Sequence, residues 1–163
     1  MKKKLLFIVA ALLILTTTGC SLFNKFKERD YFDGTSWKDK YDSQMVFQDN
    51  NWYWYELASN HNDNYYAGTY KSYKGATAVV FVGTGELEKY GVTTEKVNKM
   101  FNSTNKEENL IIIDVDTTKF LRNGKDQEIK DGKQYYFGFL SEDGFSMSLT
   151  NLKTFSTFTF TKE

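Results

Sequence analysis

The chain has 163 residues, and its 21 Lys and Arg residues balance 21 Asp and Glu residues, so the formal net charge is zero. Without a basic surplus, the composition argues against a nucleic-acid-binding protein. Cys20 is the only cysteine, which excludes intrachain disulfides. The length suits one ordinary domain whose stability comes from its hydrophobic core.

The first twenty residues carry the clearest signal in the chain. Lys2, Lys3 and Lys4 precede the apolar run 5–15, and Thr17-Thr18-Gly19-Cys20 follows. The run is shorter than the roughly 20 residues that cross a bilayer core, which favours a secretory signal over a spanning helix. The segment resembles the signal peptide of a bacterial lipoprotein, with Thr17 in place of the usual leucine.

This resemblance implies cleavage before Cys20 and a lipid anchor on that residue, with acyl chains such as palmitate. We therefore expect a protein held at the extracytoplasmic face of the cell membrane through Cys20. Residues 1–19 would be the removed signal peptide, residues 20–32 the lipidated tether, and residues 33–163 a single domain.

The domain is expected to be mainly β. Aromatic and β-branched side chains are abundant and proline is absent, a bias that suits pleated sheets. Turn signals divide the N-terminal half into short strand candidates. These candidates are residues 35–38, 44–48, 52–57, 65–73 and 76–82.

The spacing of apolar residues changes between the two halves. Val97, Met100 and Phe101 fall at helical spacing behind Thr93 or Thr94, either of which would suit a helix N-cap. One or two short helices are therefore expected over 85–103.

The C-terminal half shows the hairpin pattern most clearly. Asn123-Gly124, Asp131-Gly132 and Asp143-Gly144 are pairs typical of two-residue turns, which need positive φ at both central positions. Phe145, Met147 and Leu149 alternate with serines and so should share one face. The strand candidates here are residues 110–121, 125–130, 133–140, 145–150 and 154–161.

About eight to ten strands in meander order favour closure, because a barrel removes the exposed edges of a sheet. We therefore expect an antiparallel barrel or half-barrel with a short helical insertion near 85–103. The segments Asp33-Gly34-Thr35-Ser36-Trp37 and Tyr66-Ala67-Gly68-Thr69-Tyr70 resemble the strand openings of calycins, the group of the lipocalins. This resemblance implies that Trp37 is buried in the core and that the barrel has an apolar cavity. In size and signal the chain also resembles the small uncharacterised lipoproteins of Gram-positive bacteria, a likeness that implies no function.

An aromatic block is the most unusual feature of the domain. Trp52, Tyr53, Trp54 and Tyr55 are consecutive, so a strand would direct the two Trp side chains to one face and the two Tyr side chains to the other. One pair is expected in the core, and the other is exposed or covered by the helical insertion. The hypothetical binding residues are Trp52, Tyr53, Trp54, Tyr55, His61, Tyr66 and Tyr70, with the loop 60–64 as a polar rim.

Little in the sequence indicates catalysis. His61 is the only histidine and lies in an Asn-rich run typical of a loop tip, and one histidine without a free cysteine makes a zinc site improbable. Weak calcium binding through Asp63, Asp114 or Asp116 stays open. We expect no enzyme, no cofactor and no metal.

Three classes of function remain after this reading. The leading one is a non-enzymatic binding module for a small amphiphile, a glycan or a protein. The alternative is an inhibitor, an immunity-like factor or an accessory protein of a membrane complex, which would work through its loops. A cell-envelope hydrolase is the third. An open apolar cavity would favour the first class, and a packed interior the second.

Overall fold

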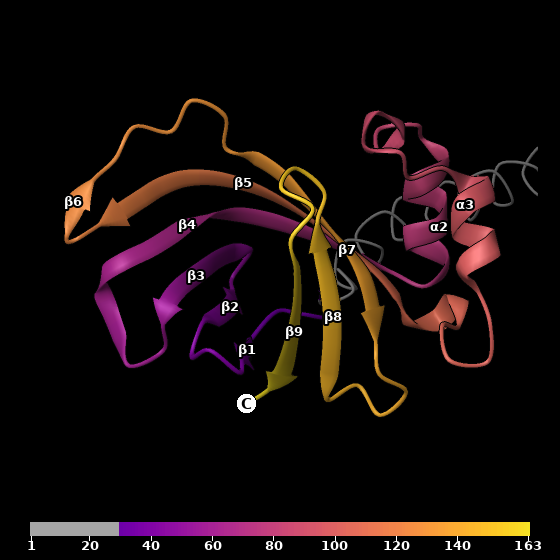
Figure 1. Ribbon diagram of the computed structural model, residues 1–163, viewed down its shortest axis with the longest axis horizontal. Helices are drawn as coiled ribbons and strands as arrows, with labels where there is room; N and C mark the ends of the chain where they lie inside the picture. The colour runs from indigo at the N-terminus through magenta and orange to yellow at the C-terminus, as the bar shows by residue number, and fades with distance from the viewer. Residues whose placement is uncertain (1–29) are drawn as a thin grey trace, which may run out of the picture.

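The computed structural model describes residues 30–163, which form a closed antiparallel β-barrel with two short α-helices against its outside (Figure 1). The ring runs β1-β2-β3-β4-β5-β7-β8-β9 and closes because β9 pairs with β1, while β6 is an extra strand beside β5. The predicted barrel is confirmed, in its closed form. The strands are β1 (Thr35–Asp39), β2 (Gln44–Gln48), β3 (Asn51–Leu57), β4 (Asn60–Lys74), β5 (Leu110–Arg122), β6 (Lys125–Asp126), β7 (Lys133–Leu140), β8 (Ser146–Asn151) and β9 (Thr157–Lys162).

Two tight turns use the left-handed backbone region at both central residues. Asp49 and Asn50, with φ of 53° and 64°, join β2 to β3, and Asn123 and Gly124, with φ of 52° and 69°, join β5 to β6. The turn predicted at Asn123-Gly124 is therefore confirmed. Asn and Asp tolerate this region better than other side chains, which explains their place here.

The other two turn predictions are wrong in part or in full. At Asp143-Gly144 only Gly144 has a positive φ, and the Asp143 carboxylate accepts instead from the Phe145 N–H at 3.0 Å. Neither Asp131 nor Gly132 has a positive φ. Gly132 allows its backbone to approach the backbone of Thr117 closely, because a Cβ there would meet the Thr117 carbonyl.

The strands predicted at 125–130 and 145–150 differ from the structure at their ends. The candidate at 125–130 is only β6, two residues long, because the chain then leaves β5 as a loop. Phe145 precedes β8 and its side chain is exposed, so it does not share the inner face of Met147 and Leu149. Most other strand predictions agree with the structure to within a few residues.

The strand predicted at 76–82 is wrong, because these residues form helix α2 (Ala76–Gly83). Their β-branched side chains suggested a strand. Gly75, with φ of 58°, instead ends β4, and its carbonyl accepts from the N–H groups of Ala78 and Val79. Burial of Ala78, Phe81 and Val82 against the barrel outweighs the local preference.

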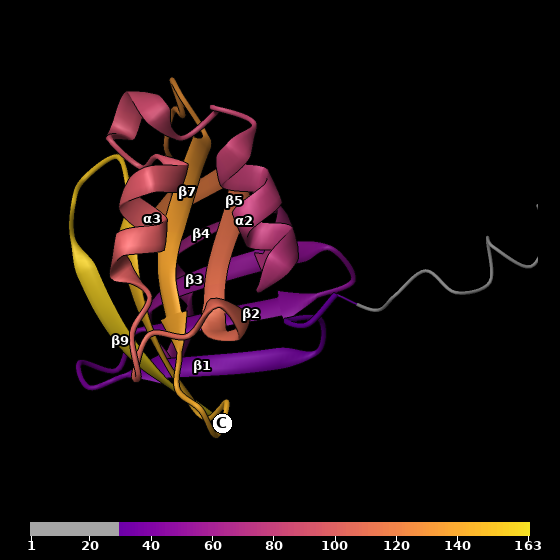
Figure 2. The same ribbon diagram turned by 90° about the vertical axis from the view of Figure 1, so that its right-hand side faces the viewer.

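The helical prediction for 85–103 is confirmed. The segment holds a 3-10 turn η1 (Glu88–Tyr90) and helix α3 (Thr94–Met100), and a second 3-10 turn, η2 (Glu107–Asn109), leads into β5. Thr93 is the N-cap of α3, and its hydroxyl accepts from the Lys96 N–H at 3.3 Å. Figure 2 shows α2 and α3 lying across β5 and β7.

The interior of the barrel is packed with side chains from every strand of the ring. Trp37 is buried, as predicted, and its indole N–H donates to the Thr35 hydroxyl at 2.8 Å. Phe32, just before β1, packs on Trp37 and Phe47. The buried residues of this core are Phe32, Trp37, Met45, Phe47, Trp52, Tyr70, Ile111, Ile113, Val115, Tyr136, Leu140, Met147, Leu149 and Phe160.

A second apolar cluster lies outside the barrel, beneath the helices. It joins Phe81 and Val97 to the outward side chains of β5 and β7, including Ile112 and Phe137. The two strands are therefore buried on both faces, which explains the continuous apolar run 110–113.

Residues 1–29 lie outside the described part of the chain, so the predicted signal peptide, Cys20 and most of the tether are not placed. Within residues 30–163, every helix is too short or too polar to span a bilayer.

Candidate functional site

The aromatic block divides between the two faces of β3, as strand geometry requires. Trp52 is buried in the barrel core and Trp54 packs against that core, whereas Tyr53 and Tyr55 point to the outside. The outer pair is partly exposed and is not covered by the helices, which lie over β5 and β7. The inner pair is therefore the core pair.

Strand β4 divides its predicted binding residues in the same way. Tyr66 lies opposite Trp54 and faces inward, and Tyr70 is buried in the core. His61 belongs to β4, so the prediction of a loop over 60–64 is wrong. The chain reverses at residues 58–59 instead, and Asp63 extends the pairing by accepting the Gly124 N–H at 2.9 Å.

The outer face of β3 and β4 carries a compact group of rings. The His61 imidazole stacks on Tyr55 with centroids 3.7 Å apart, and Tyr53 lies parallel to Tyr55 at 6.0 Å. Partial burial raises the pKa of Tyr55. Tyr65 adds a tilted ring 5.8 Å from Tyr55, so one side of Tyr55 is already occupied by protein.

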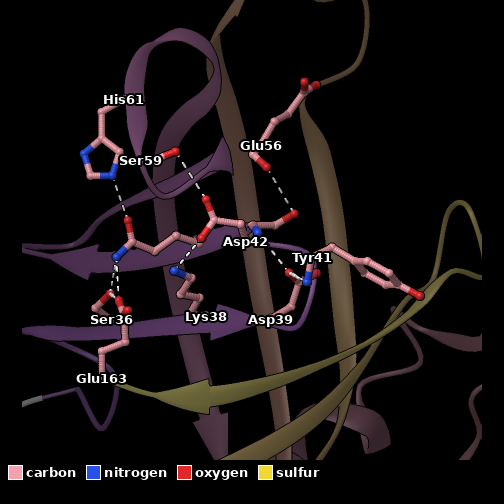
Figure 3. Close-up of polar contacts among 11 residues, drawn as sticks. Ser36, Lys38, Asp39, Tyr41, Asp42, Glu56, Ser59, His61 and Glu163 are labelled. Carbon is pink, nitrogen blue, oxygen red and sulfur yellow. Dashed lines mark hydrogen bonds and ion pairs between the residues drawn. The ribbon is translucent and has the colours of Figure 1, made fainter.

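Polar groups border this outer group (Figure 3). The side-chain oxygen Oε1 of Gln44 lies 2.8 Å from His61 Nε2. The side-chain nitrogen Nε2 of Gln44 donates to Ser36 Oγ at 2.9 Å and to Glu163 Oε2 at 2.6 Å. Lys38 and Asp42 form an ion pair at the β1–β2 hairpin. These polar groups therefore make hydrogen bonds and an ion pair with one another.

A second group of rings lies at the opposite end of the barrel from Phe32. We call it the mouth, and it consists of Trp54, Tyr66, Phe120 and Phe158. Trp54 meets Phe158 edge-on at 4.7 Å, and Tyr66 stacks on Phe120 at 4.3 Å. All four side chains are only partly buried, and burial raises the pKa of Tyr66.

Sequence reasoning missed two members of the mouth. Phe158 stands in the alternating run Thr157-Phe158-Thr159-Phe160-Thr161, a pattern that already indicates an inward-facing ring. No such signal marked Phe120, because β5 shifts register against β4 between Ala67 and Gly68, and this shift decides which residue faces Tyr66.

A groove of about 800 Å³ runs beside the mouth along the junction of β1 and β9. The two strands pair over only three residues, from Trp37 with Lys162 to Asp39 with Phe160. The groove is lined mostly by polar and charged residues of these strands and of the β1–β2 hairpin, and its two aromatic residues are Tyr41 and Phe158. It therefore leads from solvent to a ring of the mouth.

A larger groove of about 1240 Å³ lies at the other end, among Asp33, Lys74, Glu107 and Glu108. It borders Asp30, the first described residue, and so lies where the preceding chain joins the barrel.

Of the residues considered for metal binding, Asp63 lies between His61 and Tyr65 on β4, whereas Asp114 lies away from both ring groups. Asp114 points out of the barrel and pairs with Lys133 at 2.6 Å, and Asp63 accepts from the Asn60 amide at 2.8 Å. Within residues 30–163, no three His, Cys, Asp or Glu residues are arranged to hold a metal ion. The His61 ring has Gln44 as its described hydrogen-bond partner, not a hydroxyl nucleophile.

No protein-family model matches the chain, and no curated protein or solved structure is significantly similar to it.

Proposed function

We propose that the protein is a non-enzymatic binding module that takes a small amphiphile at the mouth of its barrel. The observation that carries the proposal is the set of four inward-facing rings that remain partly exposed there. Apolar and aromatic side chains with few polar groups among them are the usual lining of small-ligand sites. The adjoining groove of about 800 Å³ falls within the usual size range of such sites.

A packed interior by itself favours a protein that works through its loops, and it is the partly exposed rings of the mouth that support a small-ligand site instead. The deep interior is packed, which gives the fold its stability without a ligand. The rings of the mouth, by contrast, bury only part of their surface against protein. A ligand that covers the exposed parts of these rings would gain the free energy of removing that apolar surface from water.

The same proposal places the protein at the extracytoplasmic face of the cell membrane, anchored through lipid on Cys20. Its support is the resemblance of residues 1–20 to a lipoprotein signal. An amphiphile partitions into membranes, so a lipid-anchored module would meet its ligand at high local concentration.

The outer rings support a second candidate, a surface for a glycan or a protein partner. Parallel Tyr53 and Tyr55 rings beside Gln44 and Glu163 combine flat apolar area with hydrogen-bonding groups. We rank it second, because His61 already covers Tyr55 and the polar groups already bind one another.

The test is binding of N-phenyl-1-naphthylamine, a neutral dye whose emission rises in apolar surroundings. The wild-type protein should bind it saturably. Phe120→Ala, which removes a ring of the mouth, should weaken binding at least about tenfold, because covering such a ring contributes about 1.5–3 kcal/mol. Tyr53→Ala is the matched control, since it removes a partly buried ring from the outer face.

Equal weakening by Tyr53→Ala would move the site to the outer face. Absence of saturable binding to the wild-type protein would refute the proposed site at the mouth. Circular dichroism of each variant checks that the barrel has folded.

A further inference from the structure

Two buried polar atoms lie within the barrel without a hydrogen-bond partner among the described residues. They are the indole nitrogen Nε1 of Trp52 and the hydroxyl Oγ1 of Thr117. The side chains are almost completely enclosed, with 1% and 5% of the residue surface exposed. Such an atom costs about 1–3 kcal/mol when it is left unpaired, so its presence needs an explanation.

The strand register places both residues on the inner face and near each other. Trp52 lies opposite Gly68, and Gly68 lies opposite Thr117 on the next strand. Residues directly opposite in a sheet point to the same face. Gly68 has no side chain, and the backbone of Asp116 and Thr117 occupies the place that a Cβ there would take.

The row lies just below the mouth. Trp52 is two residues from Trp54 on the same face of β3, and both indoles contact Tyr136, with centroids 6.3 and 5.9 Å away. Beside Tyr136, the Asn151 amide donates to Gln134 at 2.8 Å. Both atoms have almost no exposed surface, so a molecule that enters through the mouth reaches them only by displacing the side chains that cover them.

The chemistry of these atoms limits what they bind. An indole N–H only donates, and a threonine hydroxyl is able to donate, so together they suit an acceptor oxygen with two lone pairs. No buried residue among residues 30–163 is Lys, Arg or His. A carboxylate or phosphate at this depth would lack a counter-charge, which makes its burial unfavourable.

Charges do occur farther out, where Glu56 and Arg122 act on Tyr66. These two side chains carry opposite charges, so together they favour neither an anionic nor a cationic ligand.

We propose that the mouth binds a neutral single-chain amphiphile whose carbonyl or hydroxyl oxygen accepts hydrogen bonds from Trp52 Nε1 and Thr117 Oγ1. This inference rests on the proposed function and adds the class of ligand and its orientation. The oxygen-bearing head lies inside, and the alkyl chain lies along the rings of the mouth toward the groove at Phe158.

The experiment measures displacement of N-phenyl-1-naphthylamine by two probes with the same chain length, monodecanoylglycerol and decanoate. Both are used below their critical micelle concentrations at pH 8, where the carboxylate is ionised. The neutral ester should bind at least about tenfold more tightly, a ratio that corresponds to the penalty for an unpaired buried charge.

Thr117→Val decides the role of the hydroxyl, because it keeps the side-chain shape and removes one donor. It should weaken ester binding roughly three- to tenfold, the value of one hydrogen bond, and leave dye binding unchanged. Thr159→Val is the matched control, since it makes the same change on the exposed outer face of β9. Trp52→Phe should act like Thr117→Val on the ester.

Each outcome has a distinct meaning. Equal affinity for ester and carboxylate, or ester binding that is unchanged in Thr117→Val, would overturn this inference while dye binding leaves the proposed function intact. Ester binding that is unchanged in Thr117→Val would mean that Trp52 Nε1 and Thr117 Oγ1 bind water only. Failure of the dye to bind the wild-type protein would refute the proposed function itself.

Discussion

Replacing Trp37 by Ala should lower the free energy of unfolding by about 3–5 kcal/mol, the usual cost of deleting a large buried aromatic. The side chain has no exposed surface, and its ring lies 5.8 Å from Phe32. The indole N–H bond to Thr35, at 2.8 Å, accounts for about 1 kcal/mol of that loss. Since domains are stable by only about 5–15 kcal/mol, the variant should retain a small margin.

Urea unfolding followed by far-UV circular dichroism measures this loss. Trp37→Phe should lose less, about 1–2 kcal/mol, because it keeps a ring in the core and gives up only the hydrogen bond and part of the volume. Phe145→Ala is the control, since that ring is exposed and its loss should stay within about 0.5 kcal/mol. If Trp37→Ala unfolds within 1 kcal/mol of the parent, the account of this core is wrong.

Three further predictions concern the backbone, the tyrosines and the anchor. Gly68→Ala should lower the free energy of unfolding in urea by about 1–3 kcal/mol, because a Cβ would meet the Asp116 carbonyl. Gly83→Ala should not lower it, because a Cβ there meets open space. Burial raises the pKa of Tyr136 above the ordinary value of 10.0, so its contribution to stability is complete below that pH and falls as pH rises further. The free energy of unfolding should therefore decline above about pH 10, less steeply in Tyr136→Phe, and equal slopes would contradict this. In the producing cell, Cys20→Ala should leave the chain unprocessed or released, whereas mass spectrometry that finds unmodified Cys20 on a mature protein would contradict lipidation.

The fold was largely predictable from the sequence because its signals are local. Asn123 and Gly124 mark a turn through their backbone preferences, and Thr93 marks the start of α3 through its cap. Alternating apolar residues give the strands their inner faces. The region 76–82 was not predictable in this way, since Gly75 and packing on the barrel outweigh its β-branched side chains.

The site was predictable only in part. Four of the proposed residues, Trp52, Trp54, Tyr66 and Tyr70, do face one interior, but Tyr53, Tyr55 and His61 lie on the opposite side of the sheet. Period-two alternation separates the two sets, but it does not show which set faces the core. His61 was placed in a loop because asparagines favour turns, whereas tertiary pairing extends β4 through this segment.

The mouth itself arises from unequal strand lengths, which no local sequence pattern predicts. Strands β4 and β5 have 15 and 13 residues, whereas β8 and β9 have 6 each. The long strands continue past the short ones toward β6 (Figure 1). Tyr66 and Phe120 therefore extend the inner surface where β8 provides no opposing side chain. If all the strands were equally long, opposing side chains would have buried these rings. The exposed aromatic surface therefore follows from the unequal strand lengths.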